Sequence, residues 1–265
     1  IFSFFVIKSK QKMAIEIKHI CKSYGEKKVV DDVSLVIPTG KITSFIGPNG
    51  AGKSTVLGII SRLLTADSGE VYLNHLPLKE QKNTDIARKM AILKQSNHVN
   101  LRITGEELVA FGRFPYSKGN LTEIDRTFID NAIKYMNLDD IREQYIENLS
   151  GGQRQRAYIA MTLAQDTDYI LLDEPLNNLD MKHSVQIMQV LRKLVTELNK
   201  TVVIVIHDIN FASCYSDYMV AMKRGKLVAQ GSVDEIMQSE VLLNIYDMEI
   251  PIQEINQQKI AVYFK

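Results

Sequence analysis

The sequence predicts an α/β fold with a mainly parallel sheet, an N-terminal antiparallel β region and an inserted α-helical subdomain. The parallel sheet is indicated by three short, mainly apolar runs, with many β-branched residues, at positions 42–46, 169–172 and 201–206. Strands that are buried on both faces show this continuous pattern. Segments with helical periodicity separate the runs, and an alternation of strand and helix is typical of βαβ units.

Two amphipathic helices are expected beside these strands, over residues 54–64 and 180–198. In the first helix the apolar residues up to Leu63 and Leu64 are expected on the buried face, and in the second the apolar positions recur every three or four residues as far as Leu198. Upstream of both, residues 14–37 are expected to form strands around a polar turn at Gly25.

The middle of the chain has a different pattern. Residues 96–165 show helical periodicity and no comparable buried strand. The clearest helix is expected over residues 121–138, where Thr122 is the N-cap, Asp125 follows three residues later and Ile124 begins an apolar stripe. This region is therefore expected to form the helical subdomain.

These boundaries predict one domain over residues 13–265, in which residues 13–95 and 166–265 form the core and residues 96–165 form the helical subdomain. Residues 1–12 are expected to be disordered and to lie upstream of the natural start, which would be the methionine that follows them. Their apolar stretch has no preceding basic region, so a signal peptide is disfavoured.

Composition excludes several classes of protein. The 265-residue chain is 24% charged with a net charge of +1, so it has no strong basic field for nucleic acid, and no nucleic-acid partner is expected. Its two cysteines, Cys21 and Cys214, cannot form a disulfide framework, which favours a reducing cytosol. No segment has the roughly 20 apolar residues of a spanning helix, so a function at a membrane would require another chain to supply the span.

Residues 47–54, GPNGAGKS, match the pattern GxxxxGK[ST] of a phosphate-binding loop, between an expected strand and an expected helix. Glycines let consecutive N–H groups face a phosphate chain, and the helix N-terminus adds partial positive charge. Lys53 is expected to reach the β- and γ-phosphates, and the Ser54 hydroxyl to bind Mg²⁺. The sequence thus predicts a P-loop NTPase core, with nucleotide-binding residues Gly47, Pro48, Asn49, Gly50, Ala51, Gly52, Lys53, Ser54 and Thr55.

Two acids and a histidine end the other two apolar runs. Asp173 and Glu174 follow one run, and His207 follows the other. Because the carboxyl ends of parallel strands meet at one edge of a sheet, all three are expected beside the phosphate loop. There Asp173 can hold Mg²⁺, Glu174 can act as the general base that polarises the attacking water, and His207 can hydrogen-bond the γ-phosphate and orient the water. The competing interpretation is of solvated acids and a structural histidine.

A second glycine-rich helix start lies at residues 149–153, LSGGQ. Ser150 is placed to cap the helix, and Gly151 and Gly152 permit a close backbone approach, so the segment can bind an anion. One chain has little use for two γ-phosphate sites around one nucleotide, whereas two chains related by a twofold axis would use both. Simple helix capping is the alternative, and the spacing alone does not decide between them.

The ordered set of motifs resembles the nucleotide-binding subunit of ABC transporters, over residues 13–265. The resemblance rests on residues 47–54, Gln95, residues 149–153, residues 171–174, Asp180 and His207. It implies ATP and Mg²⁺ as cofactors and a RecA-like catalytic core. The segment LNNLD at residues 176–180 departs from the commoner TSALD of the family and places Asn177 where a serine usually stands.

The resemblance also implies roles that the spacing did not supply. Tyr24 resembles the aromatic residue that stacks on adenine. Gln95 resembles the flexible-loop glutamine that contacts the metal and the water and senses the membrane subunit. Asp180 resembles the aspartate that crosses the dimer interface. The residues that would contact the ATP of the partner chain are Ser150, Gly151, Gly152 and Gln153.

Residues 107–116 and 154–165 resemble the importer branch that carries ferric siderophores, haem and cobalamin. The resemblance therefore implies the ATP-hydrolysing subunit of an importer, with a ferric siderophore or a related iron complex as the preferred cargo. Expected partners are a second copy of the chain, integral membrane permease subunits and, indirectly, a substrate-binding lipoprotein. The subunit would be peripheral, at the cytoplasmic face of the plasma membrane. A soluble non-transport ABC ATPase and an exporter cassette are the alternatives.

Overall fold

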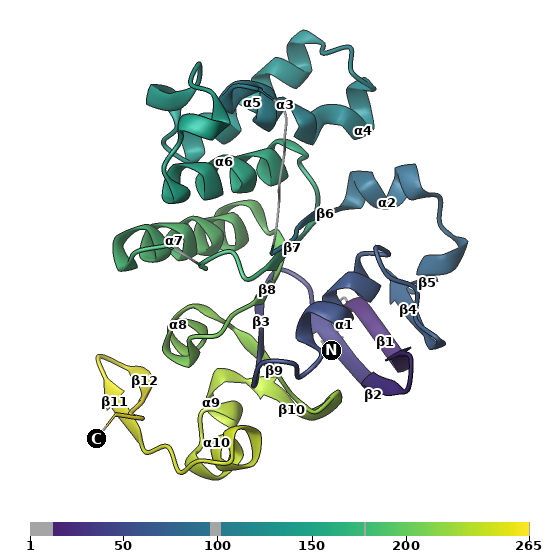
Figure 1. The fold of residues 1–265 in the computed structure, drawn as a ribbon, viewed down its shortest axis with the longest axis vertical. Coiled ribbons are helices and arrows are strands. Elements are labelled where there is room, and N and C mark those ends of the chain that lie inside the picture. The colour runs from purple at the N-terminus through teal and green to yellow at the C-terminus, as the bar shows by residue number, and fades with distance from the viewer. Residues whose placement is uncertain (1–12, 96–101, 178, 265) are drawn as a thin grey trace, which may run out of the picture.

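A parallel sheet lies at the centre of the molecule (Figure 1). The computed structural model describes residues 13–95, 102–177 and 179–264. Six strands form this sheet in the order β10-β9-β3-β8-β7-β6. Its five parallel strands are β3 (Ile42–Ile46), β6 (Met90–Leu93), β7 (Tyr169–Asp173), β8 (Thr201–Val205) and β9 (Tyr218–Lys223). The edge strand β10 (Lys226–Ser232) is antiparallel to β9.

An antiparallel sheet packs beside the first, with the order β2-β1-β4-β5. Its strands are β1 (Met13–Tyr24), β2 (Lys27–Pro38), β4 (Ser68–Leu73) and β5 (Leu76–Pro77). Gly25 has a φ of +58° in the tight turn between β1 and β2, which confirms the predicted turn. Helix α1 (Lys53–Ile60) lies between the two sheets (Figure 1), where its apolar residues share one core with both.

The two faces of the parallel sheet belong to two separate cores, because successive side chains of a strand point to opposite faces. On β8, Val203 and Val205 join the core that contains α1, whereas Val202 and Ile204 join a second core. The helices of the second core include α7 (Met181–Leu198), α8 (Ile209–Tyr215) and α10 (Ser239–Tyr246). The other elements outside the segment between β6 and β7 are η1 (Leu78–Glu80), α2 (Asn83–Lys89), α9 (Val233–Ile236), β11 (Ile252–Ile255) and β12 (Gln258–Ala261), with α2 leading into β6.

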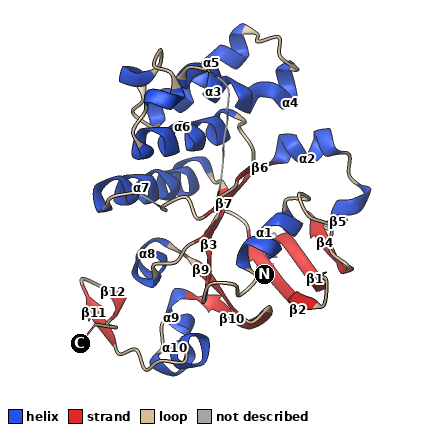
Figure 2. Cartoon of the chain, in the orientation of Figure 1, coloured by secondary structure: helices blue, strands red, loops and turns tan. Residues whose placement is uncertain are grey.

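Helices build the part of the chain between β6 and β7, at the top of Figure 2. Thr122 caps α5 through a reciprocal pair of hydrogen bonds with Asp125, as predicted. The elements of this helical part are α3 (Gly105–Ala110), η2 (Phe111–Arg113), α4 (Phe114–Ser117), α5 (Glu123–Tyr135), η3 (Asp139–Ile141), η4 (Ile146–Asn148) and α6 (Gly151–Ala164).

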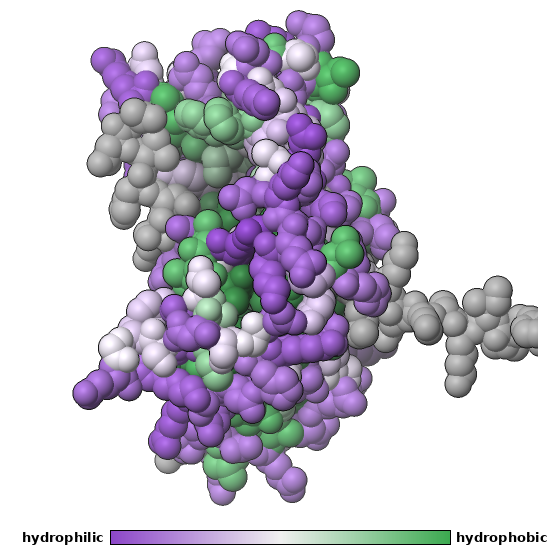
Figure 3. All heavy atoms as spheres, turned by 90° about the vertical axis from the view of Figure 1, so that its right-hand side faces the viewer, coloured by the Kyte–Doolittle hydropathy of each residue, from purple (hydrophilic) through white to green (hydrophobic). Residues whose placement is uncertain are grey.

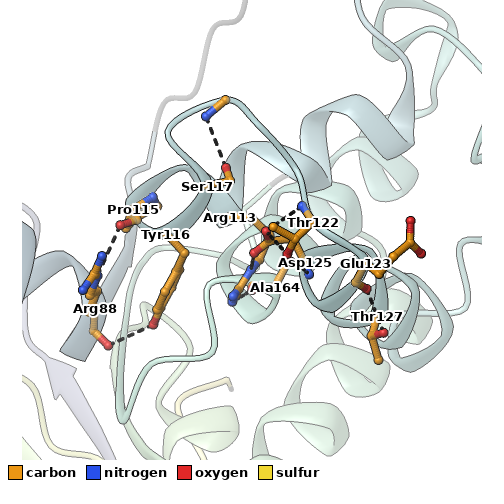
Figure 4. Close-up of polar contacts among 11 residues, drawn as sticks. Arg88, Arg113, Pro115, Tyr116, Ser117, Thr122, Glu123, Asp125, Thr127 and Ala164 are labelled. Atoms are coloured by element: carbon orange, nitrogen blue, oxygen red, sulfur yellow. Dashed lines mark hydrogen bonds and ion pairs between the residues drawn. The ribbon is translucent and has the colours of Figure 1, made fainter.

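A buried arginine holds these helices together (Figure 4). Arg113 is only 4% exposed, and its guanidinium donates to Asp125 Oδ1 at 2.9 Å and to the Ala164 carbonyl oxygen at 2.9 Å. The same guanidinium lies 4.1 Å from the centroid of the Tyr116 ring. The Tyr116 hydroxyl donates to the carbonyl oxygen of Arg88 at 3.3 Å, which joins α4 to α2 (Figure 4).

Three expectations about the helices were wrong. The first helix ends at Ile60, because Arg62 turns the backbone into the left-handed region with a φ of +62°, and Leu63 is left 45% exposed. Leu198 is 53% exposed because it is the last residue of α7, where Asn199 turns the backbone into the left-handed region with a φ of +51°. Ile124 is 69% exposed because it faces away from the apolar side of α5.

The described side chains are mostly hydrophilic on the face that carries β4, β5, α2 and α4 (Figure 3). Hydrophilic side chains form most of that face, and hydrophobic ones occur in small groups between them (Figure 3). Among the described residues, every helix is too short or too polar to cross a bilayer.

Candidate nucleotide-binding site

The phosphate loop connects β3 to α1 and depends on glycine at two close approaches. Gly47 has a φ of +129°, and a Cβ there would lie 2.0 Å from the Met222 carbonyl oxygen. Gly52 has a φ of +99°, and a Cβ there would lie 2.6 Å from the Val29 carbonyl oxygen. Neither position can accept a side chain without moving backbone, so the loop geometry requires glycine.

Lys53 is the first residue of α1 and is buried. Its Nζ donates to the carbonyl oxygens of Gly47 at 2.7 Å and Pro48 at 3.0 Å, so the ammonium lies across the loop. Burial lowers the pKa of Lys53, and the nearby charges of Glu174 and Asp173 oppose that shift. The site therefore holds a partly desolvated cation beside two acids.

Ser54 and Asp173 meet directly although 119 residues separate them. The Ser54 hydroxyl donates to Asp173 Oδ1 at 2.8 Å. Burial raises the pKa of Asp173, while the hydrogen bond from Ser54 opposes the rise. The carboxylate is thus placed where a cation would stabilise its charged form.

Glu174 lies one residue beyond β7 and has a φ of +50°, in the left-handed region. Its side chain is 9% exposed, and Oε1 lies 2.7 Å from His207 Nε2. Gln95 Nε2 donates to Glu174 Oε2 at 2.6 Å, and Asn177 Nδ2 donates to the same oxygen. Side chains that follow three neighbouring strands, β6, β7 and β8, therefore converge on one carboxylate, as parallel strands predict.

A cleft of about 140 Å³ opens over the phosphate loop. It is lined by residues 49–55 of the loop and α1, together with Val29, Glu174 and His207. A neighbouring groove of about 240 Å³ is lined by Ser54, Gln95 and Asp173 among others. The structure thus brings the predicted loop, acid, histidine and glutamine residues to one place.

The predicted residues 150–153 and Asp180 do not line this cleft. Ser150 caps α6: its hydroxyl accepts from the Gln153 N–H at 3.2 Å, and its own N–H donates to Gln153 Oε1 at 3.0 Å. A Cβ at Gly151 would meet no described atom within 4 Å, so the helix start is open to the outside. Tyr24, at the end of β1, is also exposed and outside the cleft lining.

Asp180 caps α7, and His183 joins that helix start to the start of α6. Asp180 Oδ1 accepts from the His183 backbone N–H and from its ring Nδ1, both at 2.8 Å. These contacts lower the pKa of Asp180, the backbone hydrogen bond being the larger cause. A Cβ at Gly152 would lie 3.4 Å from the imidazole ring, so the histidine packs directly on the glycine.

Sequence reasoning missed the contacts of His183 and Asn177. The histidine three residues after an N-capping aspartate was a usable signal for the first. The amide of Asn177 gave no signal of its partner, because only the turn after β7 brings it back to Glu174.

A glycine-rich loop at a helix start, with a lysine, a serine and two acids at the ends of adjacent parallel strands, defines a P-loop nucleotide hydrolase. A sequence profile described as "ABC transporter" matches residues 30–177. The chain belongs to the ABC transporter family, as an ATP-binding subunit that hydrolyses ATP.

Related proteins match nearly the whole chain. The petrobactin import ATP-binding protein YclP of Bacillus subtilis is 58% identical over 250 residues, which cover 94% of this chain and 99% of the relative. The petrobactin import ATP-binding protein FatE of Bacillus anthracis is 47% identical over 249 residues, covering 94% and 100%. A dimeric structure of MJ0796, a bacterial ABC transporter cassette, superimposes with a TM-score of 0.75 and 33% identity over 83% of this chain and 98% of that one.

Proposed function

We propose that the chain powers an importer for ferric siderophores, as a dimeric subunit at the cytoplasmic face of the plasma membrane. The single observation that supports its catalytic role is the convergence of the phosphate loop, Asp173, Glu174 and His207. The cargo is inferred from the names of the petrobactin import relatives. We assign residues 13–95 and 166–265 to the catalytic core and residues 96–165 to an α-helical subdomain.

The side chains around the cleft fit a magnesium ion. Hydroxyl and carboxylate oxygens are ligands that Mg²⁺ prefers, and Ser54 and Asp173 supply one of each at 2.8 Å from one another. Burial raises the pKa of Asp173, which a cation would reverse. Ser54 and Asp173 would hold the ion, with Gln95 on the adjoining groove wall. Bound there, Mg²⁺ would neutralise charge on the β- and γ-phosphates.

Hydrolysis would proceed by positioning and charge stabilisation. Glu174 accepts a proton from a water whose oxygen bonds to the γ-phosphorus, while the bond from that phosphorus to the β,γ-bridging oxygen breaks and ADP leaves with the electron pair. His207 holds Glu174 Oε1 in place at 2.7 Å. Lys53 exchanges the loop carbonyls for phosphate oxygens, and the loop N–H groups stabilise the developing charge.

The exposed N-terminus of α6 and the nearby N-terminus of α7 could contact a second copy of the chain. Ser150, Gly151, Gly152 and Gln153 lie outside the chain's own cleft, at the N-terminus of a 14-residue helix where an anion is stabilised. In a twofold pair they would face the partner's ATP, with Asp180 crossing the interface beside them. Tyr24, exposed on β1, would stack on the adenine.

A membrane permease would dock on the helical part and thereby couple to Gln95. Phe111 and Phe114 are exposed at η2 and α4, and the Arg88–Tyr116 contacts join this region to α2, which leads into β6 and Gln95. The substrate-binding lipoprotein would contact the permease and not this chain. Residues 96–101 of the expected helical subdomain, and residues 1–12, which are expected to be disordered, lie outside the described residues.

Deletion of the gene in its native strain tests the proposed cargo. Uptake of ⁵⁵Fe-labelled ferric petrobactin should fall to background, and a plasmid copy should restore it whereas a Lys53→Ala copy should not. Normal uptake in the deletion strain would overturn the cargo assignment. Failure of purified protein to hydrolyse Mg-ATP would overturn the catalytic assignment instead.

A further inference from the structure

The carboxylate of Glu174 is contacted by the side chains of Gln95, Asn177 and His207. Of these three residues, Asn177 has no assigned role. We propose that Asn177 is a positioning residue, whose amide fixes Glu174 so that Oε1 is the oxygen that accepts the proton from water. The proposal rests on the proposed role of Glu174 as general base.

The backbone alone cannot orient this carboxylate. Glu174 is fixed at a φ of +50°, and its N–H donates to the Val205 carbonyl oxygen at 3.1 Å, so the main chain is anchored to β8. Three side-chain torsions remain free beyond Cα, and each staggered alternative would move the carboxylate by several bond lengths. Hydrogen bonds to the carboxylate therefore decide where it points.

The donors are divided unequally between the two oxygens. Oε1 contacts His207 Nε2 at 2.7 Å, whereas Oε2 accepts from Gln95 Nε2 at 2.6 Å and also from Asn177 Nδ2. A carboxylate oxygen offers about two lone-pair directions, so Oε2 is saturated and Oε1 retains one. The remaining lone pair of Oε1 is the one that can take a proton.

Asn177 is the donor that is built into the same turn as the base. The Asn177 N–H donates to the Glu174 carbonyl oxygen at 3.3 Å, and its side chain turns back to Oε2. Gln95, by contrast, is attached to β6 and belongs to a different segment. Loss of the Asn177 amide would free one lone pair on Oε2 and allow the carboxylate plane to rotate about its remaining contacts.

If Asn177 positions Glu174, the variants at residue 177 should rank differently in kcat from the ranking that their effect on folding alone would give. Asn177 is exposed, so for folding alone aspartate is the milder replacement and leucine the harsher one. If residue 177 acts through Glu174, the order reverses, and aspartate lowers kcat more than leucine does. Asn177→Leu removes one donor and should lower kcat about tenfold, as for one hydrogen bond to a charged group. Asn177→Asp adds a like charge against Glu174 and should lower kcat by about a hundredfold or more.

The experiment measures Mg-ATP turnover of the full-length protein with Asn177→Leu, Asn177→Asp and Asn177→Ser. The KM for ATP should stay within about twofold in all three, because the amide touches the base and not the phosphate loop. Serine keeps a shorter donor and should restore part of the kcat lost with leucine. Asn131→Leu and Asn131→Asp, on the exposed surface of α5, are the matched controls and should retain wild-type turnover.

A second background identifies the partner of Asn177. With Glu174→Gln the carboxylate charge is gone, so adding Asn177→Asp should leave ATP affinity and ATP-driven dimer formation unchanged. Equal kcat for wild type and Asn177→Leu, or a better kcat for aspartate than for leucine, would overturn the proposal while wild-type hydrolysis continues. Absence of hydrolysis by the wild-type protein would instead refute the catalytic function on which it rests.

Discussion

Replacement of Arg113 by methionine tests whether the buried guanidinium holds the helical part together. The change keeps a long apolar side chain and removes the charge, so Asp125, itself 4% exposed, is left buried without its cation. The variant also removes the hydrogen bond to the Ala164 carbonyl and the contacts with the rings of Tyr116 and Phe128.

The size of the stability loss depends on the hydrogen bonds that Asp125 keeps when Arg113 is replaced. Removal of one partner from a buried ion pair costs about 3–5 kcal/mol. Asp125 Oδ2 still accepts hydrogen bonds from the Thr122 N–H at 3.0 Å and from the Thr122 hydroxyl at 2.7 Å. The cost of losing the ion pair is therefore expected at the lower end of this range. The two ring contacts, at 4.1 and 4.2 Å from the guanidinium, add about 0.5–2 kcal/mol each. A total loss of about 4–7 kcal/mol in the free energy of unfolding is expected.

Urea unfolding followed by circular dichroism measures this loss, with Arg126→Met as the control because that arginine is largely exposed on α5. Asp125→Asn added to Arg113→Met removes the stranded charge and should recover about 1–2 kcal/mol. A loss below about 1 kcal/mol for the single variant, or a double variant less stable than the single one, would show that the pair is not the buried contact that we describe.

Three substitutions test the assigned roles at the two helix starts and at the base. Lys53→Ala should weaken Mg-ATP binding about 100-fold in calorimetry, since hydrogen bonds from an ammonium to phosphate oxygens are lost, and near-normal affinity would remove Lys53 from its role. Glu174→Gln should still bind ATP but lower kcat by about 10²–10⁴, and should accumulate as an ATP-bound dimer in sizing experiments; full turnover by a monomer would contradict both assignments. Gly151→Asp should fold and bind nucleotide normally, because a Cβ at that position meets no described atom within 4 Å. It should lose ATP turnover, because its carboxylate would face the partner's phosphates. Unchanged turnover would show that residues 150–153 only cap α6.

The sequence predicted those parts of the molecule in which local pattern and topology agree. The runs that became β3, β7 and β8 are mainly apolar and lack the polar alternation of a half-exposed strand, as is typical of strands buried on both faces; the polar Thr43 and Ser44 of β3 are fully buried as well. The strands β6 (MAIL) and β9 (YMVAMK) escaped notice, because alanine, methionine and leucine favour helices when taken alone and only pairing with a neighbouring strand selects the extended form.

The same distinction applies to the site. Asp173, Glu174 and His207 were predictable because parallel strands deliver their carboxyl ends to one edge. The contacts of Asn177 and His183 were not, since they depend on side-chain directions in one turn and on how two helix starts pack. Such contacts follow from tertiary structure, and a linear motif contains no information about them.

The positions of Asn177 and Asp180 suggest how a second copy could control hydrolysis without touching the base. The turn after β7 is attached to Glu174 through Asn177, and its far end is attached through Asp180 to His183, which packs on Gly152. In the proposed dimer, a partner that binds the starts of α6 and α7 would act on the far end of this turn, at Asp180. The Glu174 N–H is anchored to β8, whereas the donor on Oε2 comes from Asn177 in the turn, so a shift of Asn177 would change the hydrogen bond to Oε2 and leave the backbone of Glu174 in place. If the chain forms the dimer that we propose, contact at Asp180 and hydrolysis at Glu174 would be linked through Asn177, because proton transfer depends on the orientation of the base.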